Sequence, residues 1–247
     1  MSKNFELLRQ SGWSQEFFQG LPTESRHFET AQRRIKRRPM GNDQISQLVQ
    51  RVFLDPRNPR IRCVMFTANS RRVGCTWTCA QAAKILAESI EGTVCAVDTN
   101  FREPALHHYF SVEGRDGLAN AVAESKPAKE FAKHIHEGNL WLVAAGRSTR
   151  RSGPTADGAL LETHLRELRG GFDYLLVDAA LVSARSNATA VARAVDGAVL
   201  VVESTESGPH AVLDARRHLD KAHVPLLGVV LNQRSSVLPS VLDRLMR

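Results

Sequence analysis

The segment 67–83 (TANSRRVGCTWTCAQAA) has the residue types and spacing of a loop that binds phosphate groups. Such loops read Gly-x-x-x-x-Gly-Lys-Ser/Thr between a strand and a helix. Their backbone N–H groups surround the phosphates, the lysine neutralises them and the hydroxyl holds Mg²⁺. By spacing, Asn69 stands at the first glycine, Gly74 at the second, Cys75 at the lysine and Thr76 at the hydroxyl. The spacing therefore predicts a phosphate loop that has kept its shape and lost its ammonium charge.

Other residues of this loop bear on how it meets an anion. Gly74 can adopt the left-handed conformation, and asparagine tolerates that conformation better than most residues do. A thiol cannot replace an ammonium, but Arg71 and Arg72 carry positive charge from other backbone positions. Both arginines also add bulk where a phosphate loop brings its backbone close to the ligand. The loop residues that we assign to nucleotide binding are Asn69, Arg71, Arg72, Val73, Gly74, Cys75, Thr76 and Trp77.

Two aspartates end apolar segments that have the pattern of buried strands. Asp98 follows TVCAV, and Asp178 follows YLLV. In open parallel sheets, ligands bind beyond the carboxyl ends of the strands, so both carboxylates are predicted at the ligand edge. Each can contribute to a magnesium site or cap the helix that follows, and both interpretations stay open. Arg102 either pairs with Asp98 or faces solvent.

These candidate residues need a sheet to position them, and the apolar pattern predicts its strands. Unbroken apolar runs of strand length indicate burial on both faces, and helical spacing between them indicates the crossovers of a parallel sheet. The predicted fold is α/β, a mostly parallel P-loop-type sheet with helices on both faces. Strands are predicted at 61–68, 93–98, 140–146, 174–180, 197–203 and 226–232, and helices at 44–53, 78–90, 158–169, 187–194 and 209–222.

Residues 1–45 differ from the rest of the chain because they are polar, basic and without sustained periodicity. We predict a flexible N-terminal arm over 1–45 and a P-loop-like α/β domain over 46–247. The run RRIKRR at 33–38 contributes to the net charge of +7. We interpret it as a solvated part of the arm, with contact to nucleic acid or anionic lipid as the alternative.

The composition, 43% apolar and 24% charged, is that of a globular protein. No apolar run approaches the roughly 20 residues that cross a bilayer, and the N-terminus has no signal-peptide core. A cytoplasmic location is therefore predicted. The chain has no Ser-His-Asp arrangement with a nucleophile elbow, and its cysteines lack the spacing of a zinc site. We expect these cysteines to be reduced and buried: Cys63, Cys75, Cys79 and Cys95.

Four further segments resemble motifs of the bacterial tyrosine kinases (BY-kinases) of exopolysaccharide biosynthesis, within the wider class of Min/Par-type P-loop ATPases. The family's second motif, a strand ending in Asp-x-Asp followed by Arg and Pro, is matched by VCAVDTNFREPALHHYF. A turn leading into a short helix is matched by DGLANAVAE. The third motif and the strand after it are matched by YLLVDAALVSARSNATAVARAVDGAVLVVES. The strand ending in Val-Leu-Asn is matched by LLGVVLNQ. The resemblance spans residues 61–235.

The resemblance implies ATP and Mg²⁺ as the cofactors of the family, and we expect their binding to this chain to be weak or absent because the lysine is replaced. It also implies a role for each matching residue. Asp98 matches an aspartate that helps to organise Mg²⁺, and Asp178 matches the Walker B aspartate. Thr76 matches the Mg²⁺-binding hydroxyl, so the implied metal site is Thr76, Asp98 and Asp178. Asn232 matches a position near the adenine and joins the nucleotide-binding set. Asn100 stands where the family has its second aspartate at the catalytic centre.

Four departures from the family pattern point away from an active autokinase. Cys75 replaces the lysine and Asn100 replaces an acid, which argues against phosphoryl transfer. The C-terminal tyrosine cluster is missing, because the only tyrosines are Tyr109 and Tyr174, and this argues against autophosphorylation. The segment QISQLVQRVF also lacks the family's oligomerisation pattern, Glu-x-x-Arg-x-x-Arg. The resemblance thus implies a degenerate, pseudokinase-like member that acts as a regulatory or docking subunit in exopolysaccharide biosynthesis or export. Its expected partner is a membrane chain-length regulator or an active kinase, which would bring it to the inner face of the membrane, and homo-oligomers are a further expectation.

Two alternatives stay open. The first is a divergent but active ATP-dependent tyrosine kinase that uses Arg71 or Arg72 in place of the lysine. The second is a partition-type binder of nucleic acid that uses RRIKRR and the basic loop around 146–151. The sequence has no aromatic-rich face of the kind that binds single-stranded nucleic acid, so it offers no strong nucleic-acid signal.

Overall fold

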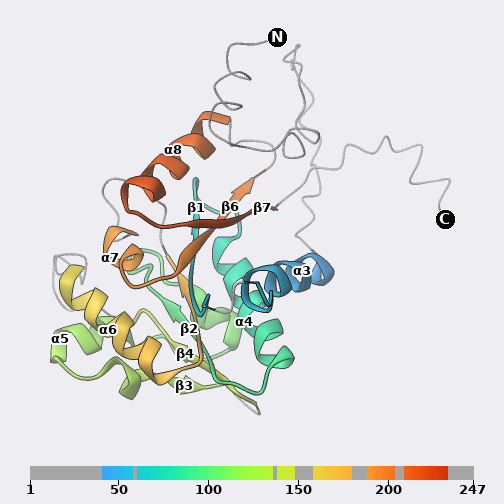
Figure 1. Cartoon of the computed structure of the whole chain (residues 1–247). Coiled ribbons are helices and arrows are strands. Elements are labelled where there is room, and N and C mark those ends of the chain that lie inside the picture. Colours follow the sequence, from blue (N-terminus) through green and yellow to red (C-terminus); the bar gives the residue numbers. More distant parts are fainter. Residues whose placement is uncertain are drawn as a thin grey trace, which may run out of the picture. The chain divides into compact units, whose positions relative to one another are not determined.

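The structure is a computed structural model that describes residues 41–57, 60–135, 138–147, 158–179, 188–203 and 209–232 (Figure 1). All of these residues belong to one compact unit, residues 36–247. Most of the predicted arm, including RRIKRR, lies outside the described residues. None of the helices in these ranges is both long and apolar enough to span a membrane.

One seven-stranded sheet forms the centre of the described chain, in the order β3-β4-β2-β5-β1-β6-β7. Neighbouring strands are parallel except at the β3–β4 edge, where the pair is antiparallel. The predicted mostly parallel α/β fold is confirmed. The strands are β1 (Cys63–Ala68), β2 (Val94–Asp98), β3 (Lys133–His134), β4 (Leu140–Val143), β5 (Tyr174–Asp178), β6 (Gly197–Glu203) and β7 (Leu226–Asn232).

Helices cover both faces of this sheet, as the unbroken apolar strands predicted. The helices α3 (Asn42–Phe53) and α4 (Cys75–Ser89) share a core cluster with one face. The other face packs against α5 (Leu118–Glu124), α6 (Gly158–Gly171), α7 (Ala188–Ala192) and α8 (Pro209–Lys221). Two short 3₁₀ helices, η1 (Leu106–Phe110) and η2 (Ala128–Phe131), complete the described elements. Leucines of α6 with no exposed surface, Leu161, Leu165 and Leu168, show why its spacing is helical.

The strand predicted at 140–146 is shorter in the structure, because β4 ends at Val143. The carbonyls that follow turn to another segment: Ala144 O accepts from Leu118 N at 2.8 Å and Ala145 O from Ala119 N at 2.8 Å. The first N–H groups of α5 are therefore already satisfied by protein, so this helix start offers no anion site.

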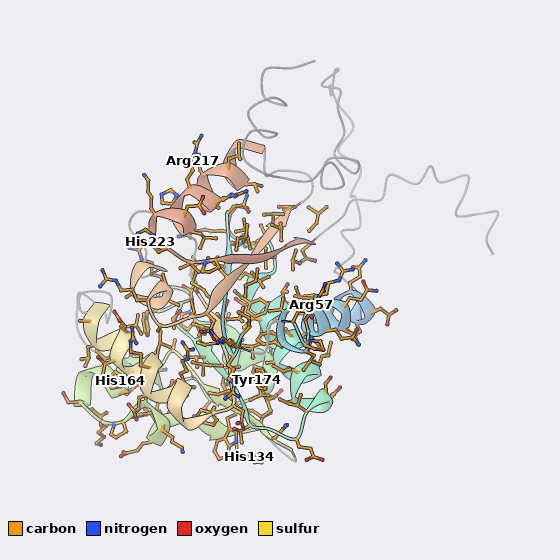
Figure 2. The ribbon with its side chains drawn as sticks, viewed as in Figure 1. Arg57, His134, His164, Tyr174, Arg217 and His223 are labelled. Atoms are coloured by element: carbon orange, nitrogen blue, oxygen red, sulfur yellow. The ribbon has the colours of Figure 1, made fainter. Side chains whose placement is uncertain are left out.

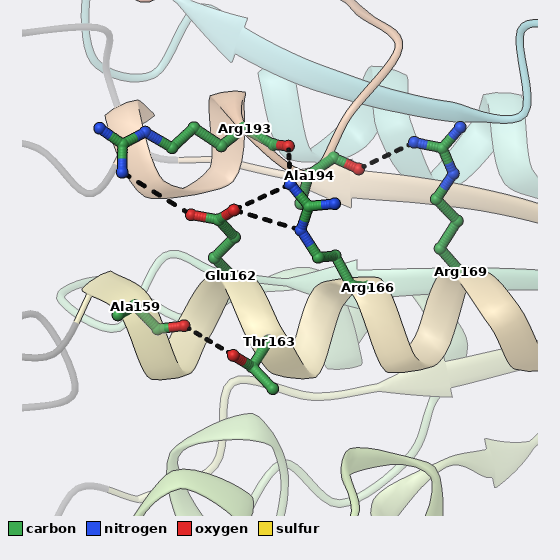
Figure 3. A network of polar contacts seen from close by, with 7 residues as sticks. All are labelled: Ala159, Glu162, Thr163, Arg166, Arg169, Arg193 and Ala194. Carbon is green, nitrogen blue, oxygen red and sulfur yellow. Dashed lines mark hydrogen bonds and ion pairs between the residues drawn. The ribbon is translucent and has the colours of Figure 1, made fainter.

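At the edge opposite the ligand edge, a network of polar contacts ties α6 to the end of α7 (Figure 3) and continues through Asp196 to β1. Arg166 donates to the Arg193 carbonyl at 3.1 Å and Arg169 to the Ala194 carbonyl at 3.4 Å, which satisfies carbonyls at the end of α7. Arg169 also donates to Asp196 at 2.6 Å. The other carboxylate oxygen of Asp196 accepts from Arg62 N and Cys63 N, both at 2.9 Å. One aspartate thus fixes the start of β1 against the start of β6.

Candidate functional site

The loop between β1 and α4 contains the left-handed glycine that its spacing predicted. Gly74 is left-handed, with φ of 87°, and stands directly before α4. A Cβ at this position would collide with Nδ2 of Asn232, so both the conformation and the contact require glycine. Arg72 is also left-handed, with φ of 60°, which is a strained position for a residue with a Cβ.

Asn232 holds this loop from the end of β7. Its Nδ2 donates to the Val73 carbonyl at 2.8 Å, and both residues are buried. The resemblance places this asparagine near an adenine. In the structure its amide is bound to the loop backbone, so it positions the loop.

Cys75 and Thr76 open α4 and face the end of β5. Burial, and next the charge of Asp178, raise the pKa of the Cys75 thiol well above its usual value. The thiol therefore stays protonated at neutral pH and supplies no positive charge. Trp77, the next residue, packs partly buried against the core cluster that α3 and α4 share.

Asp98 and Asp178 lie side by side, because β2 and β5 pair in register at these two residues. Burial, followed by the charge of Asp98, raises the pKa of Asp178 well above its usual value, against opposing hydrogen bonding from Thr76 and Cys75. Burial also raises the pKa of Asp98 to about 6, although three backbone N–H groups oppose the rise. Oδ2 of Asp178 is buried and accepts no hydrogen bond from the described residues.

The carboxylate of Asp98 accepts hydrogen bonds from backbone N–H groups of the segment that follows it. Oδ1 accepts from Asn100 N at 2.9 Å, and Oδ2 accepts from Ala105 N and Leu106 N, both at 3.1 Å. These bonds support the interpretation of Asp98 as the cap of the following helix, here η1. Arg102 is exposed, as one of its two interpretations predicted.

Asn100 closes the turn after β2. Its Nδ2 donates to the Glu103 carbonyl at 3.0 Å, and its Oδ1 accepts from Glu103 N at 3.3 Å. The carboxylate of Glu103 in turn receives Nη1 of Arg71 at 2.7 Å. Arg71, one candidate for replacing the lysine, is thus turned toward this acid.

Comparison with known proteins finds relatives among the bacterial tyrosine kinases, although no family model matches the chain. Tyrosine-protein kinase YwqD of Bacillus subtilis is 21% identical over 173 residues, which are 70% of this chain and 73% of that protein. Tyrosine-protein kinase Etk of Escherichia coli is 24% identical over 173 residues, which are 68% of this chain and 23% of that longer protein. The chain is a homologue of the bacterial tyrosine kinases.

Solved structures show that this chain shares the fold of the bacterial tyrosine kinase domains and of MinD. The kinase domain of Escherichia coli Etk superposes with a TM-score of 0.61 at 23% identity, covering 69% of this chain and 67% of that one. The septum site-determining protein MinD of Pyrococcus horikoshii, solved with Mg-ADP, also gives a TM-score of 0.61, at 20% identity over 69% of this chain and 70% of that one.

Two of the three residues of the implied magnesium site, Thr76 and Asp178, are placed so that they could hold the ion. Asp178 has a buried oxygen without a partner, and Thr76 lies against its carboxylate. Asp98 has both oxygens bound by backbone N–H groups. Over the described ranges, no three His, Cys, Asp or Glu side chains are grouped so that they could hold a metal ion. Thr76 and Asp178 are therefore the residues that fit a magnesium ion arriving with a phosphate.

Sequence reasoning missed Glu103, which the structure joins to Arg71. The acid lies between Arg102 and Pro104 within the second motif but is not one of the residues that define that motif, so only the folded turn reveals its contact. Tyr174, which Figure 2 labels, is remote from the site, since it begins β5 whereas Asp178 ends it. Its ring packs edge-on to Phe53 with centroids 6.0 Å apart. Most of the basic loop 146–151 lies outside the described residues.

Proposed function

We propose that this homologue of the bacterial tyrosine kinases is a degenerate, pseudokinase-like member that serves as a docking or regulatory subunit in exopolysaccharide biosynthesis. One observation carries the proposal: Cys75, a neutral thiol, is the first residue of α4, where the motif requires a lysine. Losing a charge-assisted contact to a phosphate lowers the binding free energy by about 1.5–3 kcal/mol. It also removes the group that stabilises the negative charge of the phosphoryl group during transfer.

The turn after β2 supports the same function. Asn100 carries no charge and cannot accept a proton as a carboxylate does. Both ends of its amide are bound to the Glu103 backbone. Asn100 therefore stabilises the turn, and the acidic groups of the site are the pair Asp98 and Asp178.

The preserved α/β frame would then act as a docking body. Its partner would be the cytoplasmic tail of a membrane chain-length regulator or an active kinase, and that partner would hold it at the inner face of the membrane. ATP and Mg²⁺ would bind weakly or not at all. Where they bind, Thr76 and Asp178 would hold the metal, which neutralises phosphate charge.

Calorimetry with ATP and Mg²⁺ tests this proposal on the wild type, on Cys75→Lys and on a Cys75→Ser control. We expect no measurable heat from the wild type and the serine variant, and binding by the lysine variant. Micromolar binding by the wild type, together with transfer of phosphate to a protein, would refute the proposal. If that transfer is also lost in Arg71→Ala, the divergent kinase is the correct alternative.

A further inference from the structure

A continuous set of contacts connects the turn after β2 to the phosphate loop. Asp98 holds Asn100 N, and Asn100 holds the backbone of Glu103 through two hydrogen bonds. Glu103 then binds Nη1 of Arg71, in the middle of the loop, at 2.7 Å. The backbone of the acid is thus fixed by the turn, and the guanidinium follows the acid.

The phosphate loop and the end of β5 still contain groups that suit an oxyanion and its cation. Nδ2 of Asn69 is a buried donor without a partner, and Oδ2 of Asp178 is a buried acceptor without one. Asp178 has 1% of its surface exposed. A phosphate oxygen satisfies the first group, and a cation that travels with the phosphate satisfies the second.

We propose that Glu103 is a specificity-determining residue that excludes oxyanions from the phosphate loop by holding Arg71 away from it. An anion in the loop competes with the Glu103 carboxylate for the same guanidinium and is also repelled by that carboxylate. The inference rests on the proposed function and deepens it, because Cys75 and Glu103 then suppress phosphate binding together.

The size of the effect follows from the exposure of the pair. The Arg71 and Glu103 side chains are 62% and 60% exposed, so water and salt weaken their interaction. Removing the competing charge should therefore raise oxyanion affinity about three- to tenfold at low ionic strength, and less at about 0.5 M salt, where the Debye length is only a few ångströms.

The experiment titrates the full chain with inorganic pyrophosphate, and separately with ATP, in the presence of Mg²⁺. Glu103→Gln is compared with Glu113→Gln, an exposed glutamate that loses the same charge, and with Arg71→Ala/Glu103→Gln. The series is repeated in a Cys75→Lys background, where baseline affinity is higher. We expect a gain in Glu103→Gln alone, equal for both ligands, which disappears without Arg71.

Three results would overturn the inference: equal affinities in Glu103→Gln and the wild type, an equal gain in Glu113→Gln, or no binding by any variant. A gain for ATP only would also contradict it, since contacts to the nucleoside would then be responsible. Phosphate transfer to protein is assayed in parallel, because it would contradict the proposed function while leaving the Glu103 result intact.

Discussion

At the scale of single residues, the two buried carboxylates govern the response to pH. The native pKa of Asp98 is about 6 against 3.8 in the unfolded chain, so the native state binds more protons between these values. The contribution of Asp98 to the free energy of unfolding is therefore complete below pH 3.8. It is lost as pH rises through 6, which lowers the free energy of unfolding by about 3 kcal/mol. The raised pKa of Asp178 acts in the same direction.

We predict that Asp178→Asn is more stable than the wild type at pH 8 by about 1–3 kcal/mol, because burial makes the ionised carboxylate costly and its Oδ2 accepts no hydrogen bond from the described residues. The advantage of the variant should shrink as pH falls and the carboxylate becomes protonated. Thermal unfolding followed by circular dichroism between pH 5 and 8, without divalent cations, measures this difference. A difference that does not vary with pH would contradict the burial argument.

Gly74 yields a second prediction at this scale. Gly74→Ala should lose about 2–4 kcal/mol, from left-handed strain and from the collision with Asn232. Gly170→Ala in α6, where nothing lies within 4 Å of the added carbon, should stay within about 1 kcal/mol of the wild type. Urea unfolding compares the two, and equal losses would refute the local explanation.

The sequence predicted the left-handed conformation of Gly74, and it placed Asn232 at the site but did not predict its hydrogen bond to the loop. The glycine belongs to a local pattern that its neighbours in the chain define. Asn232 binds a carbonyl 159 residues away, and such a partner depends on how β7 lies beside the loop after β1. Glu103 was missed for the same reason, because its partner comes from another loop.

At the scale of elements, Asp196 is the residue on which the α6, α7 and β1 junction depends. Asp196→Ala should destabilise the protein by about 1–3 kcal/mol, since it leaves two strand N–H groups and Arg169 without an acceptor. Asp214→Ala is a matched control in α8, where the pair with Arg217 is exposed, and should change stability by no more than about 0.5 kcal/mol. Chemical denaturation decides, and similar losses would contradict the assigned role.

Apolar strands were the elements that sequence could predict, because burial on both faces leaves a continuous signal. The structure contains all six predicted strands. The seventh, β3, has two residues, Lys133 and His134, and no apolar pattern. Helix α4 begins at Cys75, three residues before the predicted start, since the loop passes into the helix without a polar cap.

At the scale of the whole molecule, the strand order predicts how local stability is distributed. The strands β2, β5 and β1 have neighbours on both sides and are almost fully buried, whereas β3 and β7 stand at the edges. Amide hydrogen exchange should therefore be slowest in β1 and β5 and fastest in β3 and β7. Mass spectrometry of exchanged peptides measures the order, and rapid exchange in β1 would refute it.

The class of fold follows from the alternation of strands and helices, but the order of strands in space does not follow from their order in the chain. Sequence alone places Asp98 and Asp178 at one edge of a sheet. Only the pairing of β2 with β5 brings them into adjacent register. Because the two buried carboxylates are adjacent, the charge of Asp98 helps to raise the pKa of Asp178. The electrostatics of the site therefore depends on the order of the strands in the sheet.

The two hydrogen bonds of Asn100 also restrict how this protein can change over many generations. An aspartate at this position would accept from the Glu103 N–H but could not donate to the Glu103 carbonyl, which now receives Nδ2 at 3.0 Å. An acid therefore cannot be introduced at this position by one substitution without weakening the turn that also positions Glu103. Gaining one would require a compensating change first, so the order in which substitutions can accumulate is constrained.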